Sequence, residues 1–260
     1  MILRGDFTSK ALHSTTNIQL YIPEDKDGPY RVVYLLHGLH GNQGTWLDRT
    51  MLSVYANLYN AVFVMPEVGR SFYLNLKFGR QYHNYVCDEL PEMCKKVFNI
   101  CAKREDTAVM GCSMGGYGAL RLALKKPQQY GFCGAISPAC LYFKPILEEV
   151  RNDKQAFIES GEEAHEIIAD LYATYGENLE YNPDYDIPEL VKKFPKSAPK
   201  PKIYVTCGTE DSLLKENHDF RDEMKKTDFD YTYEEWPGDH EWYFFDEALK
   251  KTLEFWYSSK

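Results

Sequence analysis

Short apolar runs alternate with amphipathic stretches along most of this chain. Runs with the length and composition of buried strands lie at 17–22, 31–36, 61–65, 107–110, 132–137, 202–207 and 231–235. Helical periodicity occurs at 45–56, 84–100, 117–126, 215–226 and 242–257, and Pro91 predicts a kink or a break in the second of these helices. The alternation predicts the α/β class, with a mostly parallel central sheet and helices on both faces.

One turn between a predicted strand and a predicted helix carries the pattern G-x-S-x-G. Residues 111–116 read Gly-Cys-Ser-Met-Gly-Gly, directly after strand 107–110 and before helix 117–126. Such a turn exposes its serine and needs small neighbours, because a Cβ would obstruct the close approach of strand and helix. The pattern predicts Ser113 as a nucleophile, and the alternative is an incidental serine in a Gly-rich turn. Cys112 is a second candidate nucleophile, although we expect it to be buried at the strand end.

A serine nucleophile needs a histidine base, which in this arrangement follows it in the chain. Four histidines precede Ser113 and are excluded on that ground: His13, His37, His40 and His83. His165 has no suitable strand before it, and His218 falls within a predicted helix. His240 lies in the loop after strand 231–235, and we predict that it is the base.

The base in turn needs an acid between it and the serine, at the end of a strand. Asp211 follows strand 202–207 and is the preferred candidate over its neighbour Glu210. Asp239 is the runner-up, but it is poorly placed to accept a hydrogen bond from the adjacent His240. The alternative role for Asp211 is a helix N-cap.

The tetrahedral intermediate that a serine nucleophile forms with a carbonyl group needs hydrogen-bond donors for its oxyanion. The residue after the nucleophile supplies one, so we expect the Met114 N–H in that role. The second is expected from the loop after strand 31–36, with the Leu39 N–H as the candidate. Three aromatic residues near these segments, Trp46, Tyr73 and Trp242, are predicted to contact substrate, with core packing as the alternative for each.

Composition narrows the partners of the chain. The 260 residues carry a net charge of −9, which argues against nucleic acid or an anionic membrane as a partner. The seven cysteines have no zinc-ligand spacing, so we expect no metal site. The chain starts without an apolar signal segment and has no run long enough to span a membrane, which predicts a cytoplasmic protein. The composition does not decide whether the protein forms a homo-oligomer.

Taken together, the motifs resemble those of the esterase D-like serine esterases, in particular the compact bacterial tributyrin/acetyl esterase branch. The matching stretches are 34–39, 41–42, Trp46, 71–73, 89–91, 111–119, 208–211 and 238–242. The resemblance implies an α/β-hydrolase fold, hydrolysis of short-chain or carbohydrate-linked carboxylic esters (acetyl, butyryl or feruloyl) through an acyl-enzyme, the triad Ser113, Asp211 and His240, and no cofactor. Feruloyl esterases and S-formylglutathione hydrolases are similar to the same set. The latter usually have a cysteine in the first oxyanion loop and a histidine after Met-Gly-Gly, where this chain has His40-Gly41 and Tyr117.

Two other activities and one role without catalysis occur with a similar sequence pattern. A thioesterase would prefer acyl thioesters, and an acyltransferase would deliver the acyl group to an alcohol other than water. A binding protein without enzymatic activity normally lacks a triad member, whereas this chain has a candidate for each.

The strand–helix rhythm stops between residues 141 and 200. This stretch has helical patterns at 145–159 and 162–175 and a tail rich in proline and lysine. We expect residues 1–260 to form a single domain, with 141–200 as a lid-like helical insertion after strand 132–137 of the core. Six aromatic residues would give the insertion an apolar face over the active site: Tyr142, Phe143, Tyr172, Tyr175, Tyr181 and Tyr185. The alternative is a surface elaboration without contact to substrate.

Overall fold

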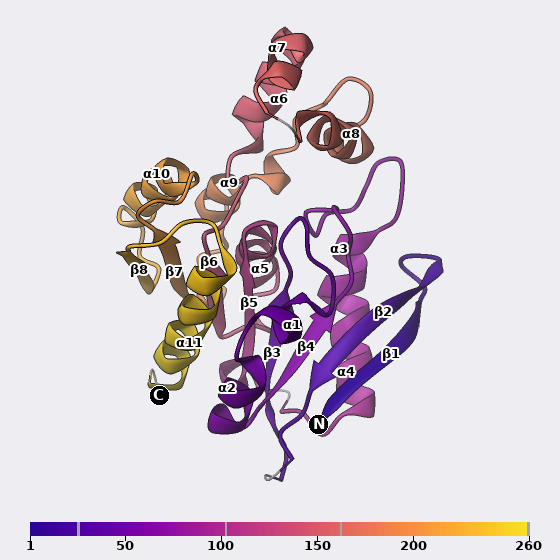
Figure 1. Ribbon diagram of the computed structural model, residues 1–260, viewed down its shortest axis with the longest axis vertical. Helices are drawn as coiled ribbons and strands as arrows, with labels where there is room; N and C mark the ends of the chain where they lie inside the picture. Colours follow the sequence, from indigo (N-terminus) through magenta and orange to yellow (C-terminus); the bar gives the residue numbers. More distant parts are fainter. Residues whose placement is uncertain (25–26, 102, 162, 259–260) are drawn as a thin grey trace.

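The computed structural model describes residues 1–24, 27–101, 103–161 and 163–258, and these contain one eight-stranded sheet (Figure 1). Its order is β1-β2-β4-β3-β5-β6-β7-β8. The strands are β1 (Ile2–Ser9), β2 (Ser14–Tyr21), β3 (Arg31–Leu36), β4 (Ala61–Pro66), β5 (Thr107–Cys112), β6 (Phe132–Ile136), β7 (Lys202–Gly208) and β8 (Tyr231–Trp236). β1 and β2 pair antiparallel and β2 is antiparallel to β4, while β4, β3 and β5 to β8 are parallel. The predicted mostly parallel sheet is confirmed, and β1 is an edge strand that the pattern did not indicate.

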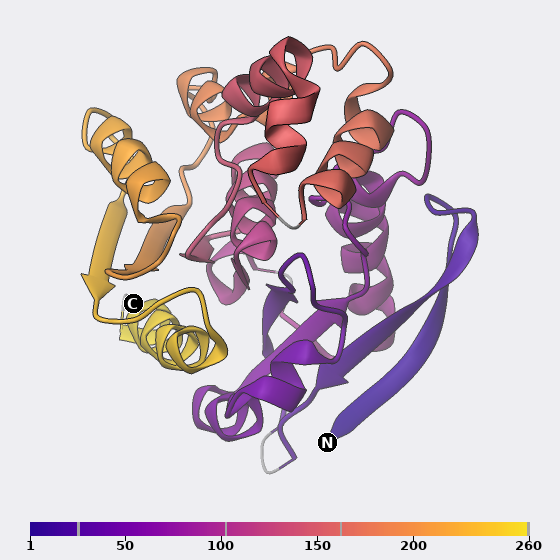
Figure 2. The same ribbon diagram turned by 45° about the horizontal axis from the view of Figure 1, so that its top comes forward.

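Helices cover both faces of this sheet, as the pattern predicted (Figures 1 and 2). One apolar core lies between the sheet and α1 (Thr45–Arg49), α2 (Leu52–Tyr59) and α11 (Trp242–Ser258). The other lies beneath α4 (Leu90–Val97), α5 (Met114–Lys125) and α10 (Leu214–Met224). Every residue of β3, β4 and β5 is buried, which explains why these strands are continuous apolar runs.

Two of the predicted helices that flank the sheet are interrupted. The segment 45–56 divides into α1 and α2 at Thr50 and Met51, where the Met51 amide donates to Asp246 Oδ1 at 2.7 Å. The segment 84–100 begins with α3 (Tyr82–Asn84), passes through the π-helical η1 (Tyr85–Glu89) and ends with α4 at Val97. The wider π turn comes just before Pro91, which cannot donate a backbone hydrogen bond and would clash with a regular preceding turn.

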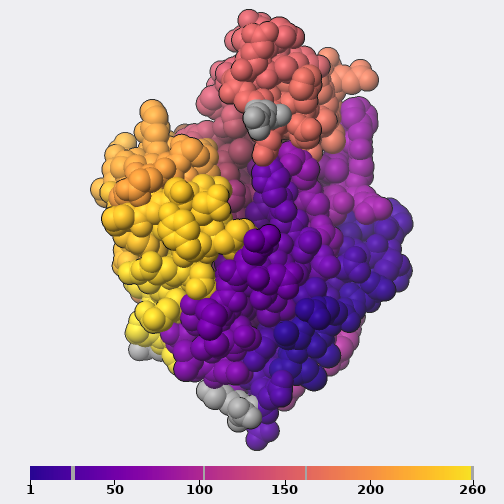
Figure 3. Space-filling model, in the orientation of Figure 1, coloured from indigo at the N-terminus to yellow at the C-terminus, as the bar shows by residue number. Residues whose placement is uncertain are grey.

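The segment between β6 and β7 is helical and stands above the carboxyl ends of the parallel strands (Figure 1). It forms the top of the molecular surface in the same orientation (Figure 3). It contains α6 (Phe143–Asn152), α7 (Lys154–Glu159), α8 (Ala164–Tyr175), the 3₁₀ turn η3 (Pro183–Tyr185) and α9 (Ile187–Lys192). The predicted helix 145–159 is broken at Asp153, whose side chain accepts from the Ala156 amide at 2.9 Å and so begins α7.

The aromatic residues of the insertion differ in position from the prediction. Phe143 and Tyr175 are buried, and Phe143 packs edge-on against Tyr117 of α5 with ring centroids 5.4 Å apart. This cluster continues to Phe72, 5.5 Å from Phe143. The aromatic side chains therefore form the core on which the insertion rests, and none of the six lines the cavity described below.

Candidate active site

Ser113 lies between the last residue of β5 and the first residue of α5. Its backbone has φ +55° and ψ −122°, a conformation that residues with a Cβ rarely adopt. The Ser113 amide donates to the Ile136 carbonyl of the neighbouring strand at 2.9 Å. Strain of this kind persists where the surrounding structure enforces it, and it is frequent at functional positions.

Glycine is required beside this turn because the backbone of β3 lies so close to it. A Cβ on Gly115 would overlap the Leu36 carbonyl, and one on Gly111 would lie 2.5 Å from the Gly115 carbonyl oxygen. These contacts are with backbone atoms, which cannot swing aside as a side chain can. The glycines of the motif therefore allow α5 to begin directly at the carboxyl end of the central strand β5, where the serine is partly exposed.

His240 and Asp211 lie on neighbouring loops, after β8 and β7 respectively. His240 Nδ1 is 2.8 Å from Asp211 Oδ2, and Asp211 Oδ1 accepts from the Leu213 amide at 2.8 Å. Burial raises the pKa of Asp211, but the hydrogen bonds from His240 and Leu213 outweigh burial and leave the pKa below its usual value. Asp211 thus holds the histidine and also anchors the turn that leads into α10.

The other candidates for the acid have different partners. Glu210 accepts from the Gly238 amide and from the Thr209 hydroxyl, so it fixes the loop before the histidine. Asp239 is exposed, and its amide donates to the Tyr243 hydroxyl at 3.1 Å. Neither carboxylate makes a hydrogen bond to His240 within the described residues.

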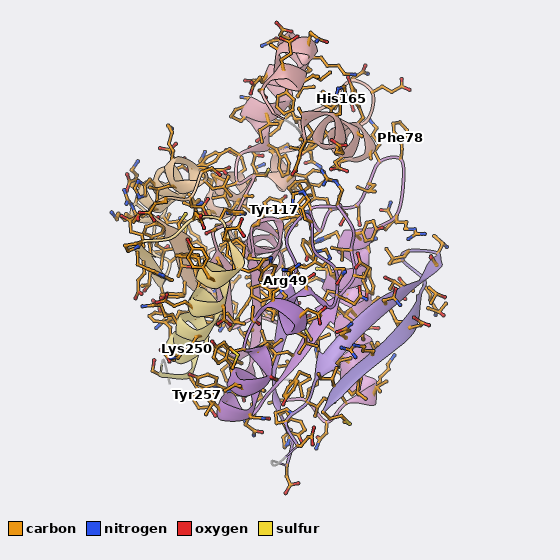
Figure 4. The ribbon with its side chains drawn as sticks, in the orientation of Figure 1. Arg49, Phe78, Tyr117, His165, Lys250 and Tyr257 are labelled. Atoms are coloured by element: carbon orange, nitrogen blue, oxygen red, sulfur yellow. The ribbon has the colours of Figure 1, made fainter. Side chains whose placement is uncertain are left out.

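The other candidates for base and nucleophile are also placed elsewhere. His218 lies on α10, and its Nε2 is 2.6 Å from Glu235. His165 is exposed on α8 of the insertion (Figure 4). Cys112 is buried, and burial raises the pKa of its thiol to about 12, so the nucleophilic thiolate is not formed near neutral pH.

A cavity of about 940 Å³ opens at the carboxyl ends of the strands, above the turn at residues 111–116 that carries Ser113 and is called the elbow below. Ser113, His240, Leu39 and Met114 all line it. Within the described residues, neither the Leu39 nor the Met114 amide donates a hydrogen bond, so both N–H groups are available to a ligand. A partly exposed serine, a histidine oriented by a buried carboxylate and two unused amides therefore share one cavity.

Only one of the three aromatic residues predicted to contact substrate lines this cavity. Trp242 does, while Trp46 and Tyr73 are fully buried beside it, contrary to the prediction. Both are held inside by their polar atoms, because Trp46 Nε1 donates to the Leu36 carbonyl at 3.0 Å and the Tyr73 hydroxyl donates to the His37 carbonyl at 2.9 Å.

Several cavity residues had no recognisable signal in the sequence. Phe72 lines the cavity in place of its neighbour Tyr73, and α8 contributes Ile167. The rim is charged: it includes Arg49, labelled in Figure 4, and His40 Nε2 lies 2.9 Å from Glu163 just before α8. The described residues contain no cluster of three or more His, Cys, Asp or Glu side chains that would hold a metal ion, and none of their helices has the length and apolar character to cross a bilayer.

A family model described as "Putative esterase" matches residues 9–256 of the chain. The chain belongs to this esterase family. The esterase is 32% identical to the acetyl esterase of Caldicellulosiruptor saccharolyticus over 265 residues, an alignment that covers 97% of each protein.

Two solved structures from Staphylococcus aureus show the same architecture over nearly the whole esterase. The fluorophosphonate-binding serine hydrolase FphF matches with a TM-score of 0.85 and 25% identity, over 98% of each chain. The S-formylglutathione hydrolase FrmB matches with a TM-score of 0.82 and 25% identity, again over 98% of each chain. The predicted α/β-hydrolase fold is confirmed, and the protein is a carboxylic ester hydrolase of the serine esterase type.

Proposed function

We propose that the esterase hydrolyses short-chain carboxylic esters through a covalent acyl-enzyme on Ser113. The observation that carries this proposal is the shared cavity, which is lined both by Ser113 at its strained turn and by His240, the partner of Asp211. A serine hydroxyl is a weak nucleophile alone and becomes effective when an adjacent imidazole accepts its proton.

In the first half of the reaction, His240 takes the proton from Ser113 Oγ while Oγ bonds to the ester carbonyl carbon. The carbonyl oxygen becomes an oxyanion and accepts hydrogen bonds from the amides of Leu39 and Met114. When the tetrahedral intermediate collapses, the bond to the leaving oxygen breaks, and His240 gives its proton to that oxygen. The alcohol leaves, and the acyl group stays on Ser113.

In the second half, His240 takes a proton from water, whose oxygen attacks the acyl carbon. Collapse returns the proton from His240 to Ser113 Oγ and releases the carboxylic acid. Asp211 accepts a hydrogen bond from the Nδ1–H of His240 throughout, which keeps Nε2 free to act as the base and stabilises the imidazolium that forms twice in each cycle.

The cavity supports a small acyl group and a polar alcohol. Phe72, Cys140 and Ile167 provide apolar surface, whereas Asn42, Glu163 and other polar residues form the rim. The acetyl esterase relative supports acetyl as the acyl group. We therefore propose acetyl and butyryl esters as substrates, with a sugar hydroxyl as one source of the alcohol and feruloyl as the largest acyl group to test.

The similarity to an S-formylglutathione hydrolase makes thioester hydrolysis the second candidate. A substrate panel separates the two activities: p-nitrophenyl acetate, butyrate and octanoate, methyl ferulate, acetylated xylan, and S-formylglutathione. We expect the highest kcat/KM for acetate or butyrate and a decline at octanoate. A kcat/KM for S-formylglutathione above that of every oxygen ester would replace the ester assignment, and new esters formed with added alcohols would indicate acyl transfer.

A further inference from the structure

We propose that Tyr73 and Trp46 are positioning residues of the oxyanion site, which aim the Leu39 amide by holding the backbone before it. The inference rests on the proposed function, in which that amide binds the oxyanion. Neither side chain lines the cavity, so any effect on the reaction has to pass through the main chain.

Three consecutive carbonyls before Leu39 each accept a hydrogen bond from an aromatic side chain. Trp46 Nε1 donates to the Leu36 carbonyl at 3.0 Å, and the Tyr73 hydroxyl donates to the His37 carbonyl at 2.9 Å. His37 Nδ1 lies 2.7 Å from the Gly38 carbonyl, and His37 Nε2 accepts from the Val68 amide at 3.3 Å, which makes Nδ1 the donor. All three side chains are fully buried, so water does not compete for these carbonyls.

The planarity of the peptide bond converts these contacts into control of the Leu39 N–H. The Gly38 carbonyl and the Leu39 amide belong to one rigid plane, in which C=O and N–H point in opposite directions. A carbonyl fixed toward the core therefore directs the N–H away from it, toward the cavity that Leu39 lines. Trp46 and Tyr73 hold the two preceding peptide planes in the same way, so the loop cannot rotate at its base.

The backbone around Tyr73 is strained in a way that serves this placement. Phe72 and Tyr73 have φ values of +51° and +56°, and bulky residues seldom adopt such angles even singly. Ser71 Oγ supports the turn by accepting from the Tyr73 amide at 3.2 Å. The turn places Phe72 in the cavity wall and Tyr73 beneath the loop.

Tyr73 also packs against the element that supplies the second donor. A Cβ built on Gly118 of α5 would lie 2.5 Å from Tyr73 Cδ2, so α5 leaves room for this ring. Met114, whose amide is the other proposed oxyanion donor, is the first residue of α5. One side chain therefore contacts both segments that carry the two amides, with its hydroxyl on one and its ring on the other.

The test compares two tyrosines that differ in what their hydroxyls hold. Tyr73→Phe removes the bond to the oxyanion loop. Tyr117→Phe is the matched control, because Tyr117 is equally buried and its hydroxyl donates to the Tyr185 carbonyl in the insertion, at 2.6 Å. For each variant we would measure kcat and KM with p-nitrophenyl acetate, the inhibition constant of a short alkyl trifluoromethyl ketone, which forms an oxyanion on the serine, and the Tm.

We expect Tyr73→Phe to lower kcat and to weaken trifluoromethyl ketone binding by similar factors of about 10–100, with KM little changed, since a misdirected donor loses part of the 10²–10³ that a missing donor costs. Tyr117→Phe should leave kcat and the inhibition constant of the ketone within about threefold of their wild-type values, even if its Tm is lower. Equal effects of the two variants would overturn the proposal.

Trp46→Phe provides a second test if Tyr73→Phe does not fold. It removes the donor to the Leu36 carbonyl, and the same joint loss in kcat and ketone affinity is expected. Unchanged ketone affinity in folded Trp46→Phe would count against the proposal. A wild-type protein that neither turns over esters nor binds the ketone would contradict the proposed function itself. This result is distinct from a failure of the positioning proposal, because it needs no variant.

Discussion

His240 Nδ1 lies 2.8 Å from Asp211 Oδ2, and the two side chains are exposed to very different degrees. The Asp211 carboxylate is fully buried, while the His240 ring is about one third exposed at the cavity. The second carboxylate oxygen is occupied by the Leu213 amide. The carboxylate therefore has one fixed orientation. The imidazole binds it through Nδ1, which leaves Nε2 available to the serine and the substrate.

Asp211→Asn tests this pair. The amide oxygen of this variant would accept from the Leu213 amide, and its NH2 group would face His240 Nδ1 and favour the tautomer with the proton on Nε2. We therefore expect kcat/KM for p-nitrophenyl acetate to fall about 10³–10⁴-fold. Asp239→Asn is the matched control, since its carboxylate is exposed and adjacent to the same histidine. Similar losses in the two variants would show that Asp211 has no special role.

His240→Ala and His218→Ala separate the proposed base from the other histidine after the serine. His218 is bound to Glu235 on the outer strand and does not line the cavity. We expect His240→Ala to abolish turnover of p-nitrophenyl acetate and His218→Ala to retain most of it. Circular dichroism of both variants checks that they are folded. Retained activity in His240→Ala would point to a different base.

Gly115→Ala tests the close packing beneath the elbow. The added Cβ would overlap the Leu36 carbonyl and would also lie close to the His37 carbonyl. Both are backbone groups, so no side chain can move aside to relieve the clash. We expect a loss of about 3 kcal/mol or more in the free energy of unfolding by urea, as for other severe steric conflicts in a core. Gly5→Ala on β1 is the control, because nothing lies within 4 Å of its added Cβ. Stable Gly115→Ala would contradict the described approach of α5 to β3.

Glu216 gives the esterase a pH-dependent term in its stability. Its carboxylate accepts from the Leu141 amide at 2.7 Å, at the start of the insertion. Burial raises its pKa from 4.5 to about 7, and backbone amides of residues 140–142 counter this only in part. Because the folded state keeps this proton longer than the unfolded chain, the stabilising contribution is complete below about pH 4.5 and is lost as the pH rises through 7.

Glu216→Gln removes that titration. We expect the free energy of unfolding of the wild type, relative to the variant, to fall by about 2–3 kcal/mol between pH 4.5 and pH 8. Urea unfolding of both proteins at the two pH values measures the difference. An unchanged difference would mean that Glu216 titrates normally in the folded protein.

The sheet and the candidate site could be predicted from the sequence because both depend on local patterns. Continuous apolar runs indicate buried parallel strands, and the order serine, acid, histidine at strand ends assigns roles without any distances. The outer strand β1 has mostly exposed residues, so no apolar alternation marked it. The breaks at Met51 and Asp153 depend on backbone amides that donate to single aspartate side chains, which helical periodicity does not indicate.

Trp46 and Tyr73 show why the lining of the cavity could not be predicted. Both lie close in the sequence to segments predicted to form the active site, and aromatic residues often contact substrates. Their direction, however, is set by bonds to the carbonyls of Leu36 and His37 and, for Tyr73, by two consecutive positive φ values. These features arise from packing between distant parts of the chain, and the sequence has no local signal for them.

The most direct test of the account is turnover of p-nitrophenyl acetate by Ser113→Ala, with its Tm measured beside that of the wild type. We predict a folded protein whose kcat/KM is at least about 10⁴-fold lower than that of the wild type, together with loss of the acetyl adduct that intact-protein mass spectrometry should detect on the wild type. Substantial turnover by folded Ser113→Ala would contradict the serine mechanism.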